Sequence, residues 1–158
     1  MNKIFALTKK ELYRFFSSPI AYIILSVMLS LFNIFFFMII DQNREVSLRD
    51  VFQLMEFMLV FFIPLLTMRL FSEEKSNGTM EFLLTAPLTH TMIVLGKYFS
   101  MLIFFTLLIF LTLIYYLIVE YFGEPDPYSM LFGYLGIWLE GAFFIAVGLL
   151  VLLGHRTK

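Results

Sequence analysis

Cysteine is absent from the 158 residues of this sequence, so disulfide frameworks and thiolate metal sites are excluded. Histidine is nearly absent too, because His90 and His155 are the only two and lie far apart in the chain. Two isolated histidines do not supply the three or four ligands, roughly, that a metal centre needs. Basic and acidic residues are few and nearly balanced, at 11 and 12, so the net charge indicates neither a nucleic acid nor an acidic substrate as partner.

Familiar motifs of catalysis and nucleotide binding are also missing. The sequence contains no GxxxxGK[ST] phosphate-binding loop, no nucleophile elbow and no HExxH motif. A chain without a phosphate-binding loop does not bind and hydrolyse ATP in that way, so energy for work has to come from a partner or an ion gradient. We therefore expect no catalytic residue, no metal site and no cofactor bound by this chain.

Apolar residues are abundant instead. They make up 61% of the sequence, and phenylalanine alone occurs 21 times. Soluble domains contain about 45–50% apolar residues, so this excess indicates an integral membrane protein. Four apolar stretches are long enough to cross a hydrocarbon core of about 30 Å as helices: 19–40, 51–68, 98–119 and 129–153. The predicted fold is all-α, with about four transmembrane helices in a single domain, 1–158.

The first 17 residues are predicted to form an amphipathic helix at the membrane surface. On a helical wheel, one side is apolar and contains Ile4, Phe5, Leu12, Phe15 and Phe16. The opposite side is basic and contains Lys3, Lys10 and Arg14. Leu7 does not fit this pattern. Such a helix suits the headgroup region; the alternative is an ordinary basic flank of the first span. Pro19 then redirects the chain, because proline is tolerated in a first helical turn.

Three polar side chains interrupt the predicted spans. Asn33 is expected to bond a neighbouring helix. Glu56 lies about one and a half turns inside the second span, where a carboxylate is either functional or close enough to the outer end to reach water. Glu140 lies near the middle of the last span. Its interpretation stays open between a substitution without function, a polar anchor inside the bundle and a residue of a transport pathway.

The lysines and arginines predict the orientation. Four spans place both termini on one side, and nine of the 11 basic residues lie on that side, in residues 1–17, 69–97 and 154–158. The loop on the other side has only Arg44 and Arg49. By the positive-inside rule the N-terminus and the central loop 69–97 are cytoplasmic. The expected location is a bacterial cytoplasmic (inner) membrane.

The central loop has the pattern of a short capped helix. Asn77-Gly78 indicates a turn. Thr79 can cap a helix with Glu81 in its first turn, where a carboxylate complements the helix dipole. Pro87 ends this helix, because the residue before a proline avoids helical geometry. Thr89 can then start the next span.

This short helix has one small apolar face, formed by side chains at i, i+3 and i+4: Met80, Leu83 and Leu84. The face either docks on another protein or rests on the bundle or on lipid, and the residues alone do not distinguish these two interpretations.

The segment SEEKSNGTMEFLLTAPLT resembles the cytoplasmic motif of type-2 ABC exporter permeases, a group that includes gliding-motility and copper-maturation permeases. The usual motif has an acidic pair, a basic residue, Gly-Thr, a glutamate, two aliphatic residues and a proline. The matching residues are Glu73, Glu74, Lys75, Gly78, Thr79, Glu81, Leu83, Leu84 and Pro87. The opening NKIFALTKKELYRFFSSPIAYI and the stretch from Gly133 to Gly148 are also similar to this family.

The resemblance implies that a separate ATP-binding cassette subunit, which holds ATP and Mg²⁺, receives the central helix in a surface groove. It further implies two permease chains, identical or different, surrounded by membrane lipid. In this docking, Met80, Leu83 and Leu84 supply the hydrophobic contact. The polar register comes from the charged residues: Glu73, Glu74, Lys75 and Glu81.

Family members usually have about six spans and an aliphatic residue where this chain has Glu140. We therefore expect a C-terminally truncated or shortened member. Two alternatives from other classes are kept. One is a small helical membrane scaffold or assembly protein without a transport cycle. The other is an ion-gradient-driven carrier that uses Glu56 and Glu140.

Overall fold

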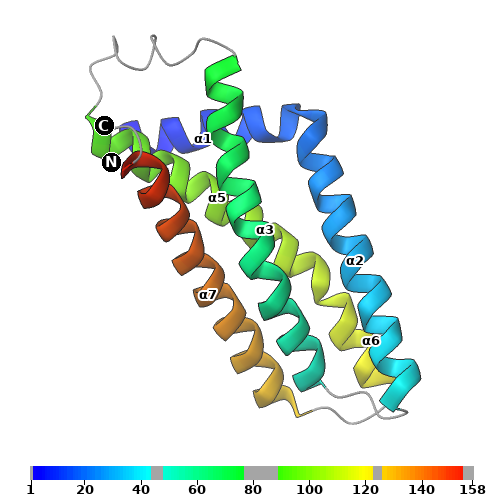
Figure 1. Ribbon diagram of the computed structural model, residues 1–158. Coiled ribbons are helices and arrows are strands. Elements are labelled where there is room, and N and C mark those ends of the chain that lie inside the picture. Colours follow the sequence, from blue (N-terminus) through cyan, green and yellow to red (C-terminus); the bar gives the residue numbers. More distant parts are fainter. Residues whose placement is uncertain (1, 44–47, 77–88, 123–125, 155–158) are drawn as a thin grey trace.

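The computed structural model describes residues 2–43, 48–76, 89–122 and 126–154, and within these ranges the chain is helical with no strand. The helices are α1 (Asn2–Ser17), α2 (Pro19–Asn43), α3 (Leu48–Ser76), α5 (His90–Thr112), α6 (Ile114–Phe122) and α7 (Pro127–Gly154) (Figure 1). This architecture confirms the predicted all-α fold.

Over the described residues, four stretches are long and apolar enough to cross a membrane, as predicted. They are Pro19–Ile39, Arg49–Met68, Thr91–Tyr121 and Pro127–Val151. The two helices around the central loop extend beyond the spans predicted at 51–68 and 98–119. Helix α3 continues from Met68 to Ser76, and α5 begins at His90 rather than at Tyr98. The apolar run marks where a bilayer fits, whereas backbone hydrogen bonding continues through the polar flanks, so each helix is longer than its apolar run.

Helix α1 lies across one end of the bundle, while the other helices run between the two ends (Figure 1). The change of direction occurs at Ser18, whose amide donates to the carbonyl of Phe15 at 3.3 Å. Pro19 begins α2, and the amide of Ala21 donates to the Ser18 carbonyl at 3.1 Å. We call the end that carries α1 the α1 end of the bundle. A helix that crosses the ends of the others is the arrangement expected of one at a membrane surface.

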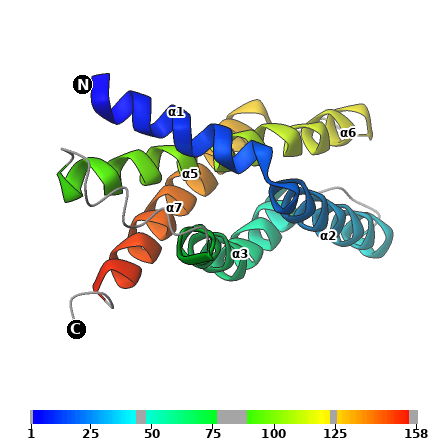
Figure 2. The same cartoon turned by 90° about the horizontal axis from the view of Figure 1, so that it is seen from above.

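Helix α1 packs along the first part of α5, and the two run in the same direction (Figure 2). Leu7 contacts Gly96, and the ring of Phe15 lies 4.6 Å from that of Phe104, so both contacts advance together along the two helices. This contact explains Leu7, which did not fit the apolar side. The predicted single apolar side was incomplete: Leu7 and Phe15 face α5, whereas Phe5 is 74% exposed on a separate side.

Helices α3 and α7 form a second pair that runs in the same direction (Figure 1). Phe52 of α3 lies against Gly133 of α7, and farther along Thr67 lies against Gly148. Glycines let two backbones approach closely, which is a common device for helix association in membranes. Pro64 interrupts the hydrogen bonding inside α3, and its carbonyl accepts a bond from the Thr67 hydroxyl at 2.8 Å.

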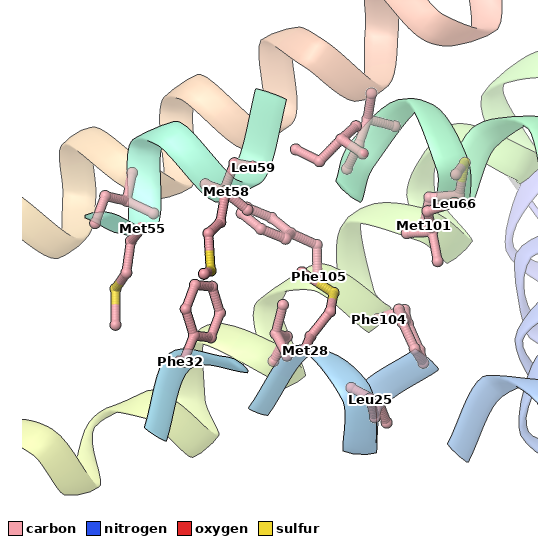
Figure 3. Packing of buried hydrophobic residues seen from close by; sticks show 14 of the residues in the cluster. Leu25, Met28, Phe32, Met55, Met58, Leu59, Leu66, Met101, Phe104 and Phe105 are labelled. Carbon is pink, nitrogen blue, oxygen red and sulfur yellow. The ribbon is translucent and has the colours of Figure 1, made fainter. Parts of the chain in front are cut away.

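Much of the apolar core lies between α2, α3 and α5 (Figure 3), and buried residues of α1, α6 and α7 complete it. It is built from large flexible and aromatic side chains, and those labelled in the figure are Leu25, Met28, Phe32, Met55, Met58, Leu59, Leu66, Met101, Phe104 and Phe105. Methionine adapts to irregular gaps between aromatic rings. The core therefore joins α3 and α5, the two helices that flank the central loop, to α2.

Candidate functional site

The central motif begins on a transmembrane helix rather than in a loop. Glu73, Glu74 and Lys75 belong to the last turns of α3. The other predicted coupling residues lie outside the described residues: Gly78, Thr79, Met80, Glu81, Leu83, Leu84 and Pro87. The short helix predicted over 79–86 and its apolar face therefore stay predictions.

Both flanks of this segment lie at the α1 end of the bundle. Helix α3 projects past α1 there (Figure 1). Its extension from Met68 to Ser76 amounts to roughly 12 Å of helix. On the return, Thr89 caps α5 in an extended conformation (φ −76°, ψ 148°), and its hydroxyl accepts a bond from the amide of Met92 at 3.4 Å. The prediction that Thr89 starts the next helix is confirmed. Helices thus flank the segment closely on both sides.

The first turns of α5 are held by α1 through an interface that includes polar side chains. Thr8 and Glu11 of α1 are buried, as are Lys97 and Ser100 of α5. The hydroxyl of Thr8 donates to the carbonyl of Ile4 at 2.9 Å, and that of Ser100 donates to the carbonyl of Lys97 at 2.8 Å. Lys97, predicted to lie in the central loop, lies inside α5 and is only 4% exposed. Each of the two hydroxyl bonds stays within its own helix, and the contacts that cross the interface include those of Leu7 with Gly96 and of Phe15 with Phe104.

The two glutamates of the predicted spans lie on the paired helices α3 and α7. Glu56 on α3 and Glu140 on α7 are close enough to interact electrostatically. Glu56 is exposed and Glu140 is half-buried. The parallel register of α3 and α7 brings the two together. Carboxylates at membrane depth are costly and often mark a function.

Asn33 makes the interhelical bond expected of it. Its side-chain carbonyl accepts a hydrogen bond from the hydroxyl of Tyr115, on α6, at 3.1 Å. The ring of Tyr115 stacks on Phe36 of α2 at 4.6 Å. The far end of α2 is thereby attached to α6.

Other polar contacts inside the spans were missed from the sequence. The hydroxyl of Tyr134 donates to the backbone carbonyl of Thr112 at 2.8 Å, and the indole nitrogen of Trp138 donates to the hydroxyl of Thr106 at 2.9 Å. The available signal was the occurrence of threonine and tyrosine inside an otherwise apolar run, at Thr106, Thr112 and Tyr115. It does not reveal the partners, because these lie on another helix.

Among the residues that the structure describes, no group of three or more His, Asp or Glu side chains is placed to hold a metal ion. The described residues therefore offer two candidate sites. One is formed by the two helix ends that flank the central segment at the α1 end. The other is formed by the polar side chains within the spans.

Taken together, the four long apolar helices define a multi-pass helical membrane protein. The family model for ABC-2 family transporter proteins matches residues 4–153, so the chain belongs to the ABC-2 transporter family. It is thus a permease-type membrane component of an ABC transporter, as the resemblance had indicated. Membership of this family implies association with an ATP-binding subunit. No curated protein and no solved structure matches the chain.

Proposed function

We propose that this chain is the membrane subunit of an ATP-driven exporter, and that a separate ATP-binding subunit docks on residues 77–88 between α3 and α5. The partner subunit binds ATP and Mg²⁺ and performs the hydrolysis, and this chain provides part of the path across the bilayer. The distribution of basic residues supports a cytoplasmic α1 end in a bacterial cell, where such a partner would have access to it.

The observation that carries this proposal is the continuous helix of α3, which extends past the apolar span into the family motif. A helix transmits a displacement along its axis through its hydrogen-bonded backbone, and the part of α3 that follows Pro64 leads directly into the motif. A partner that moves residues 77–88 therefore also moves the end of α3 and the capped start of α5. Helix α1 follows α5 because Leu7 and Phe15 are packed on it.

Transport across the bilayer needs a second permease chain in this proposal, identical or different, so that a path forms between two bundles. Lipid surrounds the remaining exposed apolar surface, which includes Phe61 and Leu65 of α3 and Phe143 of α7.

The docking claim is tested by pull-down of the ATP-binding subunit encoded beside this chain. Leu83→Asp puts a charge on the apolar face of the predicted short helix and is expected to abolish the pull-down. Thr85→Asp is the matched control, because it puts the same charge in the same segment, well away from that face on a helical wheel. Equal recovery of the partner with Leu83→Asp and with the unchanged chain would show that the docking claim is wrong.

A second candidate function is favoured by the proximity of Glu56 and Glu140. Two neighbouring carboxylates at membrane depth are what an ion-gradient-driven carrier uses to bind and release a cation. In that case Glu140→Gln abolishes transport while expression stays normal, and transport needs no ATP-binding subunit. Transport that survives Glu140→Gln and requires ATP favours the exporter.

A further inference from the structure

The third span is interrupted near its far end. The apolar stretch Thr91–Tyr121 is a single candidate span of 31 residues, yet the helix breaks at Leu113, between α5 and α6. Sharp breaks in helices usually have an identifiable cause, most often proline or glycine. Neither residue occurs between Tyr98 and Phe122, so the cause has to be sought in the hydrogen bonding.

The backbone bonds at the break are those of a tighter helix. The amide of Leu113 donates to the carbonyl of Phe110 at 3.2 Å, and the amide of Tyr116 donates to that of Leu113 at 3.1 Å. Both bonds reach back three residues rather than four, and Leu113 has φ −59° and ψ −18°. The Leu113 carbonyl also accepts the amide of Leu117, four residues on, at 3.4 Å. A turn of this 3₁₀ type in the middle of a helix often marks a hinge.

Side-chain hydroxyls donate hydrogen bonds to backbone carbonyls at this turn. The hydroxyl of Thr112 donates to the carbonyl of Ile109 at 2.7 Å. The carbonyl of Thr112 accepts a bond from the hydroxyl of Tyr134, on α7, at 2.8 Å. In an uninterrupted helix these carbonyls would accept the amides of Leu113 and Tyr116. A break inside a membrane helix is tolerated where neighbouring groups satisfy the backbone in this way.

The tyrosine that reaches the break is held firmly by its own surroundings. Tyr134 is buried, and its ring packs edge-on against Phe52 of α3 with the ring centres 5.2 Å apart. The packing of Tyr134 between α3 and α7 therefore positions its hydroxyl at the Thr112 carbonyl. On the other side of the break, Tyr115 attaches α6 to Asn33 of α2.

We propose that Leu113 is a hinge about which α6 turns relative to α5, and that the Tyr134–Thr112 hydrogen bond is the latch that holds it in the conformation seen here. Helix α5 is attached to α1 through contacts that begin at Gly96, near the central segment, whereas α6 is attached to α2 at the far end. A hinge between them lets a displacement at the α1 end change the far end without moving α2 as a rigid body. The inference rests on the proposed exporter function for the role of the motion, but the latch itself does not.

The absence of cysteine makes thiol-directed labelling specific, because no native thiol competes. Spin labels attached through Leu95→Cys on α5 and Leu117→Cys on α6 report the distance across the hinge, and both positions are exposed. Pulsed electron paramagnetic resonance in lipid nanodiscs gives the distribution of that distance. Tyr134→Phe removes the hydroxyl and keeps the ring on Phe52, so we expect a broader distribution with the isolated permease.

The matched control is Tyr98→Phe. It removes a hydroxyl that also reaches from one helix to a backbone carbonyl of another, Ala142, at 3.4 Å, but far from the break. We expect this control to leave the distribution unchanged. If Tyr134→Phe gives the same distribution as the unchanged chain, or if both variants broaden it equally, the latch is ruled out.

A second arm adds the ATP-binding subunit with ATP and vanadate. A shift of the distance between Leu95→Cys and Leu117→Cys supports a hinge that moves in the transport cycle. An unshifted distance with a partner that binds in the pull-down shows that the hinge does not take part. A partner that fails to bind overturns the proposed docking instead, and the first arm still decides the latch.

Discussion

Gly141 of α7 faces the ring of Phe105 of α5 so closely that even a methyl group at position 141 would overlap the ring. Phe105 is fully buried in the core between the helices, so its ring has little room to move aside. The approach of α7 to α5 therefore depends on the missing side chain. Gly136, one and a half turns earlier on α7, has no atom within 4 Å of the position its Cβ would occupy.

This difference predicts opposite effects for one chemical change. Gly141→Ala is expected to destabilise the bundle by about 1–3 kcal/mol, the usual cost of overpacking. Gly136→Ala is expected to be neutral or to stabilise by roughly 0.5–1 kcal/mol, because glycine is a poor helix former. Reversible unfolding in detergent micelles measures both. Equal effects of the two substitutions would contradict the close contact with Phe105.

The attachment of α1 to α5 gives a second prediction. Phe15 is buried against the ring of Phe104, and Phe15→Ala is expected to cost about 3–5 kcal/mol if the interface does not collapse. Phe5→Ala serves as the control, because Phe5 is exposed on another side of the same helix. We expect a clear drop in melting temperature in micelles for Phe15→Ala and little change for Phe5→Ala. Similar melting temperatures for the two variants would mean that α1 does not depend on its packing against α5.

The pattern of apolar stretches was enough to predict an all-α membrane protein with four spans, because a bilayer imposes a minimum length on each helix. It was not enough to predict the ends of the helices. Residues 69–76 are polar enough to read as a loop, yet they continue α3 to Ser76. Hydropathy reports the environment of a segment, whereas helical hydrogen bonding can continue beyond the edge of the membrane.

Contacts between helices were the other feature that could not be predicted from the sequence. Gly136 and Gly141 look alike in the sequence, and only the structure shows that one of them meets a ring. No proline or glycine lies near the break at Leu113, so the sequence does not predict it. In the same way, the proximity of Glu56 and Glu140 depends on the register between α3 and α7, which local sequence patterns do not encode. The predicted coupling face, Met80 with Leu83 and Leu84, stays a prediction.

The proximity of the two glutamates gives a third prediction. Each of Glu56→Gln and Glu140→Gln removes one of two neighbouring carboxyl groups, so each relieves the same like-charge interaction. The stability gained by the double variant should therefore be smaller than the sum of the single gains.

Unfolding in micelles of the two single variants and the double variant measures this difference. Glu120→Gln is a suitable control, because Glu120 is an exposed carboxylate on α6 and is expected to add independently to Glu140→Gln. Strict additivity between Glu56→Gln and Glu140→Gln would show that the two carboxyl groups do not interact.

The start of α7 gives a prediction about pH. Asp126 precedes the helix, and its carboxylate accepts bonds from the hydroxyl of Ser129 at 2.8 Å and from the amide of Tyr128 at 3.2 Å. The Ser129 hydroxyl, followed by the Tyr128 amide, lowers the pKa of the Asp126 carboxyl below its ordinary value of 3.8. Both bonds favour the ionised form, and this is how a carboxylate caps the exposed amides of a helix N-terminus.

The sign of the pH effect follows from the direction of this shift. A carboxyl group whose pKa is lower in the folded state than in the unfolded chain stabilises the folded state fully at pH values above the unfolded pKa. That contribution is lost as the pH falls through the folded pKa, because the protonated carboxyl no longer accepts the same bonds. Asp126→Ala should therefore lower the melting temperature in micelles at pH 7, and the difference from the unchanged chain should shrink on acidification below pH 3.8.

Asp126→Asn separates the charge from the cap, because asparagine still accepts a bond from the first amides of a helix but does not titrate. The other carboxyl groups titrate in all three proteins, so only differences between the variants at each pH report on Asp126. We expect Asp126→Asn to lie between Asp126→Ala and the unchanged chain at pH 7 and to approach the unchanged chain at low pH. A difference between Asp126→Ala and the unchanged chain that stays constant from pH 7 down through the acid range would show that the ionised carboxylate does not cap α7.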